Sequence, residues 1–313
     1  MNKLPSRDGY GQAILELAEK DPKVMILDAD VAKSTRTNWV GDKFPEKFLD
    51  MGISEQDMIG MAAGLSLAGM VPFATTYCVF LTGRAFDQIR TTVCYGNLNV
   101  KLAGAHAGIS VGPDGATHQS LEDVGLMRTL PNMTVVVPCD AEETRKATLA
   151  IAKEEGPCFI RFGREAVPVI TDANTPFELG KARLVRDGSD VVVFANGPLV
   201  HEATLAADDL AERNVSVMVV DLHTVKPLDG DFVTKAAQKT GAVVTAEEHQ
   251  VACGMGGAVA EHLSETHPVP VCRVGVRDSF GESGDPDELM AKYGLDRAGI
   301  IAAVDKALAR KAR

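Results

Sequence analysis

The amino-acid sequence predicts an α/β protein made of two doubly wound domains, and three observations support this fold class. Apolar runs of strand length recur along the 313 residues, amphipathic segments of helical length separate them, and the alternation starts again after a break near residue 165. Strands that alternate with helices indicate βαβ units, in which the strands form a parallel sheet. At about 150 residues per domain, the length also favours two domains, each with its own core.

The first domain is expected to span residues 1–165. Its apolar runs predict strands at 24–27, 71–75, 100–103, 134–137 and 159–161, and the segments between them predict helices at 9–19, 56–67, 84–95, 121–128 and 141–154. Asp140, which is followed by Ala-Glu-Glu, gives the last of these helices an N-cap and an acidic first turn.

The stretch from residue 58 to 83 carries no formal charge. Glycines and Pro72 interrupt it and polar residues lie near its centre, whereas a membrane span is more uniformly apolar. We therefore expect a helix followed by a strand, and no membrane segment. Because the helix is apolar on every side, we expect it to be buried.

A linker is expected at residues 166–190, where prolines and glycines lie among polar residues without clear periodicity. The second domain is expected to span residues 191–313. Its pattern predicts strands at 191–194, 216–221, 243–247 and 271–274, and helices at 199–212, 230–239, 256–266 and 297–310.

The charge balance argues against nucleic-acid and membrane partners. The chain has 32 Lys and Arg against 43 Asp and Glu, a net charge of −11, and such a surface repels phosphate backbones and anionic lipids. The six cysteines form no CxxC pair and lie among apolar residues, which favours a reducing cytoplasm over a disulfide framework. The first residues show no apolar segment, so no signal peptide is expected.

Ligands of doubly wound sheets bind beyond the carboxyl ends of the strands, so the loops there are the first candidates for a site. Ser54 and Asp57 resemble a capping box around Glu55. Glu55 either complements the dipole of the following helix or serves as a catalytic carboxylate. A carboxylate at the start of a buried helix needs a partner or a proton.

The loop at residues 105–118 follows a predicted strand and contains His106, Asp114 and His118 among three glycines. This clustering favours a functional site over isolated core histidines. A metal site is a less favoured alternative, because the two histidines are far apart in sequence and no third ligand is evident.

A further strand ends with Arg161 and Arg164, which either form a fork for a phosphate or carboxylate or only end a solvated strand. The sequence contains no GxxxxGK[ST], GxSxG or HExxH motif, so nucleotide hydrolysis, serine hydrolase and zinc protease activities have no support.

Seven collinear motifs together resemble transketolase, and the resemblance runs from about residue 6 to the C-terminus. They are 52–58 (Gly-Ile-Ser-Glu-Gln-Asp-Met), 75–77 (Thr-Thr-Tyr), 84–90 (Arg-Ala-Phe-Asp-Gln-Ile-Arg), 112–119 (Gly-Pro-Asp-Gly-Ala-Thr-His-Gln), 121–123 (Leu-Glu-Asp), 138–140 (Pro-Cys-Asp) and 224–229 (Thr-Val-Lys-Pro-Leu-Asp). The similarity covers only the second half of transketolases, the pyrimidine-binding and C-terminal domains. The GDG motif of the first half, which holds Mg²⁺ and the diphosphate, has no counterpart in the expected place. The resemblance therefore implies the C-terminal subunit of a split transketolase.

The resemblance also implies roles for residues around the cofactor, thiamine diphosphate. Glu55 matches the glutamate that hydrogen-bonds N1′ of the aminopyrimidine and promotes its reactive tautomer. Tyr77 and Phe80 match the aromatic residues that stack on or flank the pyrimidine. Tyrosine at the first of these positions, and a one-residue insertion near Gly83, depart from the common pattern.

Further residues match the substrate site of the family. His106 and His118 resemble the histidines that contact substrate hydroxyl, carbonyl and phosphate groups, and Asp114 resembles the aspartate that binds the acceptor hydroxyl next to its aldehyde. Ser34 and Arg164 resemble the pair that binds the phosphate.

The implied reaction is reversible transfer of a two-carbon ketol unit between sugar phosphates in the cytoplasm, as in the pentose phosphate pathway. The implied partner is an N-terminal subunit that binds the diphosphate and Mg²⁺. Partner subunits and a dimer core of this chain form the implied heterotetramer. Two alternatives remain: the β subunit of another thiamine enzyme (a 2-oxoacid dehydrogenase E1 component or a deoxyxylulose-phosphate-synthase-like fragment), and a non-catalytic regulatory scaffold.

Overall fold

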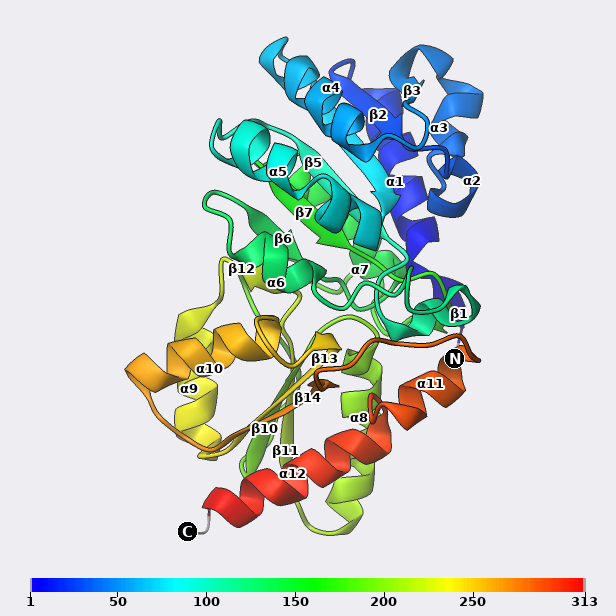
Figure 1. Ribbon diagram of the computed structural model, residues 1–313. Coiled ribbons are helices and arrows are strands. Elements are labelled where there is room, and N and C mark those ends of the chain that lie inside the picture. Colours follow the sequence, from blue (N-terminus) through cyan, green and yellow to red (C-terminus); the bar gives the residue numbers. More distant parts are fainter. Residues whose placement is uncertain (1, 312–313) are drawn as a thin grey trace.

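The computed structural model describes residues 2–311, and two large sheets divide it into an N-terminal and a C-terminal α/β unit (Figure 1). The large sheet of the N-terminal unit contains seven strands, all parallel except the edge strand β12. From edge to edge they are β12 (Thr224–Lys226), β6 (Thr134–Val136), β7 (Cys158–Arg161), β5 (Lys101–Ala105), β4 (Val71–Tyr77), β2 (Val24–Asp28) and β3 (Phe48–Asp50).

Helices cover both faces of this sheet, as the doubly wound pattern predicts. α1 (Ser6–Lys20) and α7 (Ala141–Ile151) pack on one face. The other face carries α4 (Glu55–Leu67), η2 (Phe80–Arg84), α5 (Phe86–Gln88), η3 (Ile89–Cys94) and α6 (Asp123–Arg128). Short helices lie in the connections: α2 (Ala32–Thr35), α3 (Asn38–Lys43), η1 (Pro45–Lys47) and η4 (Ile109–Asp114).

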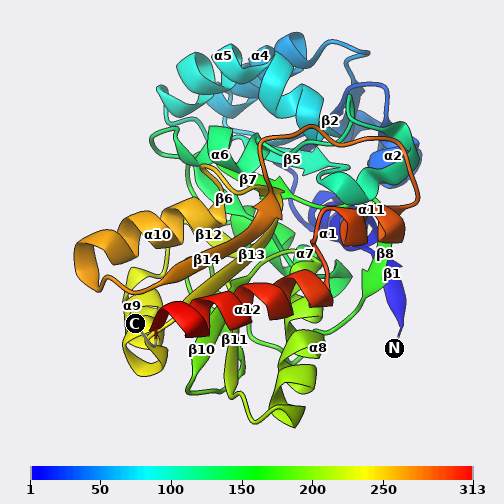
Figure 2. The same ribbon diagram turned by 60° about the horizontal axis from the view of Figure 1, so that its bottom comes forward.

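The C-terminal unit has a five-stranded sheet with the order β14 (Val271–Val276), β13 (Val243–Gln250), β10 (Val191–Ala195), β11 (Val217–Asp221) and β9 (Arg183–Arg186), of which only β9 is antiparallel. One face packs against α8 (Leu199–Glu212) and α12 (Arg297–Lys311), and the other against α9 (Gly230–Thr240) and α10 (Met255–Thr266) (Figure 2). Helix α11 (Pro286–Lys292) lies against η4 of the N-terminal unit. The predicted α/β fold class is confirmed.

The segment 166–190, which we expected to lack regular structure, carries two short strands. β8 (Ala166–Pro168) pairs with β1 (Lys3–Pro5), and β9 joins the C-terminal sheet. Strand β12 was not predicted either, and it completes the sheet of the other unit. Three or four residues are too few to show an alternating pattern, which explains why the sequence did not reveal these strands.

Helix 84–95 was predicted as one regular helix, and the structure differs. The wide turns η2 and η3 flank the three-residue α5. A wide turn accommodates one extra residue in a helix without shifting its flanks, and it is frequent at functional sites. The first wide turn contains Gly83, near which a one-residue insertion was expected from the resemblance.

The prediction that helix α4 is buried on every side was wrong for one face. Its side chains Met61 and Leu67 are 43% and 76% exposed, and Gly60 and Gly64 lie on the same open surface. The residues that face the sheet, Met58, Ile59 and Ala62, are fully buried. The apolar character of this helix therefore does not arise from burial within its own chain alone.

Five of the six cysteines are buried, as expected, but Cys253 is exposed in the turn before α10. Asp140 caps α7 as predicted, accepting the Glu143 N–H at 2.8 Å. No helix within residues 2–311 is long and apolar enough to span a membrane.

A buried arginine, paired with an aspartate of its own unit, hydrogen-bonds across to the second unit. Arg161, at the end of β7, contacts Asp123 of α6 at 2.6 Å and donates to the Glu248 carbonyl of β13 at 2.7 Å. It also donates to the Ser120 carbonyl at 3.3 Å. Arg161 is only 4% exposed, and its Nε and Nη2 atoms bind protein groups. For Arg161, the structure therefore supports neither of the two alternatives, an anion fork or a solvated strand end.

We predict that Asp123→Ala destabilises the protein strongly, because it leaves the Arg161 guanidinium buried without its counter-charge. Breaking such a pair costs about 3–5 kcal/mol. The midpoint of urea unfolding, followed by circular dichroism, measures the loss. Glu261→Ala is the matched control, since it removes the carboxylate of an exposed pair with Arg128 and costs about 1 kcal/mol or less. Equal effects of the two variants would contradict the prediction.

Candidate active site

The predicted site residues gather at one edge of the N-terminal sheet, where its parallel strands end. Ser34 follows β2, Glu55 follows β3, Tyr77 ends β4, and His106 follows β5. Arg164 lies beyond the end of β7. Side chains from separate parts of the chain therefore meet there because carboxyl ends of parallel strands share an edge.

Glu55 is the first residue of α4, and its side chain is almost completely buried. Its Oε2 atom accepts a hydrogen bond from Nη1 of Arg84 at 2.7 Å. The Arg84 guanidinium also lies over the Phe80 ring, 4.5 Å from its centroid. The predicted capping box is wrong, because Ser54 is the N-cap residue without a side-chain hydrogen bond. Glu55 therefore has the charged partner that its burial requires.

Four rings line the wall beside this pair. The Tyr77 and His106 rings are 4.3 Å apart, and Tyr77 and Phe80 are 6.2 Å apart. The His118 ring approaches Phe80 edge-on at 5.2 Å. Strand β4, helix η2 and the loop after β5 thus contribute one continuous aromatic surface.

His106 is held in an unusual conformation. Its φ of +55° lies in the left-handed region, which is uncommon for a residue other than glycine. Its ring is buried, and Nδ1 has no hydrogen-bond partner within the described residues. Burial, followed by the charges of Arg7 and Arg164, lowers the pKa of His106 to about 3. The imidazole is therefore neutral at physiological pH, with one buried ring nitrogen available to a ligand.

A cluster of arginines lies beside the histidines. Arg164 donates to the Val111 carbonyl at 3.0 Å and contacts Asp114 at 3.3 Å. Arg7 donates to the backbone carbonyl of Ser34 at 3.1 Å, and its Nε atom is buried without a partner within residues 2–311. Burial and the neighbouring Arg36 guanidinium lower the pKa of Arg7.

Arg7 was missed in the sequence, although a topological signal was available. A helix that packs on a parallel sheet and connects its strands runs antiparallel to them, so its first residues lie at the edge where the strands end. Arg7 is the second residue of α1 and accordingly lies near the loop that contains Ser34. An unpaired guanidinium there is suited to bind an anion.

The C-terminal unit fixes the loop that carries His106 and His118. Glu248 of β13 accepts the Ser110 N–H at 2.6 Å, and Gln119 donates to the Glu282 carbonyl at 2.9 Å. Gly108, at φ +88°, passes so close to Glu248 that a Cβ atom there would lie 2.2 Å from its carboxylate. The loop is thus braced from the second unit.

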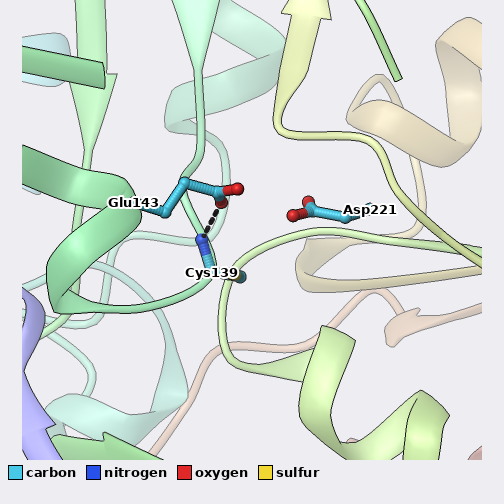
Figure 3. A group of neighbouring side chains, drawn as sticks. All are labelled: Cys139, Glu143 and Asp221. Atoms are coloured by element: carbon cyan, nitrogen blue, oxygen red, sulfur yellow. Dashed lines mark hydrogen bonds between the residues drawn. The ribbon is translucent and has the colours of Figure 1, made fainter. Parts of the chain in front are cut away.

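A separate buried cluster lies at the junction of the units, where Cys139, Glu143 and Asp221 come together (Figure 3). Their ligand atoms lie within 4.8 Å of one another, a spacing that suits a metal ion. Arg183, however, contacts all three: Asp221 at 2.7 Å, Glu143 at 3.6 Å and the Cys139 sulfur at 3.7 Å. The guanidinium supplies the cation in this cluster.

One guanidinium does not balance two buried carboxylates. Burial and the neighbouring Asp221 raise the pKa of Glu143. We infer that Glu143 keeps its proton in the folded protein, and the two carboxyl groups then share one negative charge beside Arg183.

Comparison with known proteins gives the family. Residues 2–169 match the model of the transketolase pyrimidine binding domain, and residues 180–300 match that of the transketolase C-terminal domain. The chain therefore belongs to the transketolase family. Over this span it has the domains of the C-terminal subunit of a split transketolase.

Named relatives align with the chain over nearly its whole length. It is 43% identical over 305 residues to the 6-deoxy-6-sulfo-D-fructose transketolase subunit SqwH of Clostridium sp. (strain MSTE9), covering 97% of this chain and 95% of the relative. It is 37% identical to one subunit of the apulose-4-phosphate transketolase of Phocaeicola vulgatus (strain ATCC 8482), covering 96% of each. A solved structure described as a split gene transketolase in an inactive beta4 tetramer has a TM-score of 0.93 at 48% identity, covering 98% of this chain and 99% of that one.

The protonated Glu143 gives a pH prediction. The unfolded chain releases this proton near the ordinary glutamate pKa of 4.5, whereas the folded protein retains it to higher pH. The stabilisation is therefore complete below the ordinary pKa and is lost as pH rises towards the raised one. Glu143→Gln keeps a donor and an acceptor without ionising, so its free energy of unfolding should fall less from pH 5 to 9.

Urea unfolding at a series of pH values measures this difference, with a slope of at most about 1.4 kcal/mol per pH unit for one proton. Glu142→Gln, the preceding residue on the same helix, is the control and should keep the wild-type slope. Identical slopes in wild type and Glu143→Gln would contradict a shared proton.

Proposed function

We propose that this chain, together with a diphosphate-binding partner subunit, catalyses the reversible transfer of a two-carbon ketol unit from a ketose phosphate to an aldose phosphate. The observation that carries the proposal is the juxtaposition at one sheet edge of a buried glutamate, an aromatic wall and a cluster of arginines. The glutamate and the aromatic wall suit a heteroaromatic cofactor ring, and the arginines suit a phosphorylated substrate. Membership in the transketolase family supports the same reaction.

The residues present fit thiamine diphosphate. Tyr77 and Phe80 offer ring surfaces for the aminopyrimidine, and the Glu55 carboxylate lies buried next to them. Bound thiamine diphosphate supplies the carbon nucleophile that carries the ketol unit. We propose that the partner subunit holds the diphosphate and Mg²⁺, because this chain contributes no GDG motif at the site.

Side chains of this chain transfer the proton and bind the substrate. Glu55 holds or moves a proton at its carboxylate oxygen toward a ring nitrogen. Neutral His106 offers its unpartnered Nδ1 to a substrate hydroxyl or carbonyl, and His118 reaches the same space. Asp114 accepts a hydrogen bond from the acceptor hydroxyl. Three side chains of the loop that follows β5 thereby orient one sugar.

The phosphate of the sugar is assigned to the arginines. Arg7 donates to the Ser34 carbonyl, and Arg164 lies close enough for its charge to act on Arg7, so a phosphate between them would meet two guanidinium groups. Such bidentate, charge-assisted contacts explain how an acidic protein holds an anionic substrate. The names of two relatives give different sugars, 6-deoxy-6-sulfo-D-fructose and apulose-4-phosphate, which supports variation of the sugar within this family.

The exposed face of α4 is the proposed docking surface for other subunits. Met61 and Leu67 are exposed on it, and Ile53 and Tyr95 nearby are 75% and 90% exposed. A Cβ atom added at Gly60 or Gly64 would meet nothing within 4 Å, so a neighbouring backbone can approach closely there. We propose that a dimer of this chain and two diphosphate-binding subunits form a heterotetramer that works in the cytoplasm.

Titration calorimetry of thiamine diphosphate with Mg²⁺ tests the proposal. Binding should be weak or absent for this chain alone, and tight binding with ketol transfer should follow once the co-expressed partner is present. Tight Mg²⁺-dependent binding by the lone chain would contradict the proposal that the partner subunit holds the diphosphate and Mg²⁺. Decarboxylation of a 2-oxoacid in place of ketol transfer would assign the complex to the 2-oxoacid dehydrogenase class.

We predict that Glu55→Gln abolishes most ketol transfer in the assembled complex. Glutamine keeps the size of the side chain but cannot take up or release the proton, and general acid–base groups contribute about 10²–10⁴-fold to rate. Single-turnover kinetics with saturating cofactor measures the loss, while calorimetry checks that the cofactor still binds. Retention of more than half of the rate would show that Glu55 is only a helix-terminus charge.

We predict that Arg7→Gln lowers kcat/KM selectively for phosphorylated sugars. Losing one charge-assisted hydrogen bond costs about 1.5–3 kcal/mol, or roughly ten- to hundredfold. The comparison is made between an aldose phosphate and the free aldose, whose turnover should change little. Arg213→Gln, on the C-terminal unit, is the matched control. An equal loss for both substrates would exclude a phosphate contact for Arg7.

A further inference from the structure

A groove on the C-terminal unit gathers positive charge that the proposed reaction does not use. It has a volume of about 410 Å³, and its lining residues come mostly from the edge strand β14 and from helix α12. These two elements lie side by side in Figure 2. Four cationic side chains line it and no carboxylate side chain does: Arg273, Arg277, Lys306 and Arg310. Such a concentration stands out in a chain with a net charge of −11.

None of these four cations forms an ion pair within residues 2–311. Other arginines of the same unit are paired, as Arg213 is with Asp305 at 2.8 Å and Arg297 with Asp209 at 3.3 Å. Carboxylates are therefore available around α12 but are excluded from the groove. The mutual repulsion of its cations favours the binding of an anion.

Backbone contacts hold two of the guanidinium groups in place. Arg273 donates from Nη1 to the Val251 carbonyl at 2.7 Å, and Arg277 donates from Nη2 to the Arg273 carbonyl at 2.7 Å. Each contact uses one of five N–H donors, so further donors remain for a ligand. Side chains anchored in this way lose less conformational entropy when they bind than free surface side chains do.

We propose that this groove binds a small phosphorylated molecule that carries at least two negative charges. Guanidinium groups match phosphate oxygens in bidentate geometry, and the volume lies within the range of metabolite pockets, well above the size of inorganic phosphate. The site belongs to the C-terminal unit, whereas the proposed substrate phosphate lies among Arg7, Ser34 and Arg164 of the N-terminal unit. It does not depend on the proposed ketol transfer.

Protection of a strand edge is the alternative explanation. β14 is the last strand of its sheet, and charged side chains on an edge strand discourage pairing with another chain. This accounts for Arg273 on the strand. It does not account for Lys306 and Arg310, which lie on α12, nor for the concave shape between the two elements.

Titration of tripolyphosphate into the full chain at low ionic strength tests the proposal, with calorimetry for the dissociation constant and the thermal midpoint as a second readout. The double variant R273Q/K306Q should weaken binding by at least about tenfold, as expected for two lost charge-assisted contacts. R277Q/R310Q provides an independent second pair. The thermal midpoint of each variant without ligand establishes that it is folded.

Two matched variants separate the possible outcomes. R7Q/R164Q removes two charges from the N-terminal site and should leave groove binding within twofold of wild type. R213Q/R297Q removes two charges from the C-terminal unit outside the groove and should do the same. Absence of binding in the wild type, loss of binding only in R7Q/R164Q, or equal weakening by R213Q/R297Q and R273Q/K306Q would each overturn the proposal.

Discussion

The architecture of the site depends on one buried guanidinium. Arg161 ends the strand next to β5, and it contacts Asp123, the Ser120 carbonyl and the Glu248 carbonyl at once. These partners belong to α6, to the end of the histidine loop and to the C-terminal sheet. Asp123 holds the guanidinium in place within the first unit, because a buried charge tolerates little displacement from its counter-charge. The hydrogen bond to the Glu248 carbonyl then fixes how the second unit approaches the first. The side chain of Glu248, on strand β13, then braces the loop at Ser110.

The C-terminal unit therefore acts on the site without contributing a side chain to its aromatic wall or arginine cluster. Its sheet supplies Glu248 and its loop supplies Glu282, and both hold the loop between His106 and His118. A loop of glycines and small residues has little packing of its own, and rigid neighbours reduce the entropy it would lose on binding a sugar. The second unit thus contributes preorganisation, while the first contributes the chemistry.

Sequence patterns predicted the parts of this structure that local forces determine, such as the parallel strands and the Asp140 cap. They failed where distant parts of the chain, or its absence of cover, determine whether a residue is buried. Met61 has the hydrophobicity of a core residue but lies on an exposed face, and hydrophobicity alone does not show which side of an apolar helix its own chain covers. Arg161 and Arg164 are alike in sequence, yet one is buried by tertiary contacts. Arg7 was missed because its place follows from topology.

The wide turn at η2 links an irregularity of the sequence to the geometry of Glu55. An extra residue in a helix is absorbed by widening one turn, which keeps the residues on both sides in place. Here the widened turn ends at Arg84, whose carbonyl accepts from Gln56 at 3.0 Å and whose guanidinium reaches Glu55. Because Oε2 of Glu55 already accepts from Arg84, a ring nitrogen that approaches either takes the other oxygen or displaces the guanidinium. The widened turn thereby determines how the carboxylate is presented.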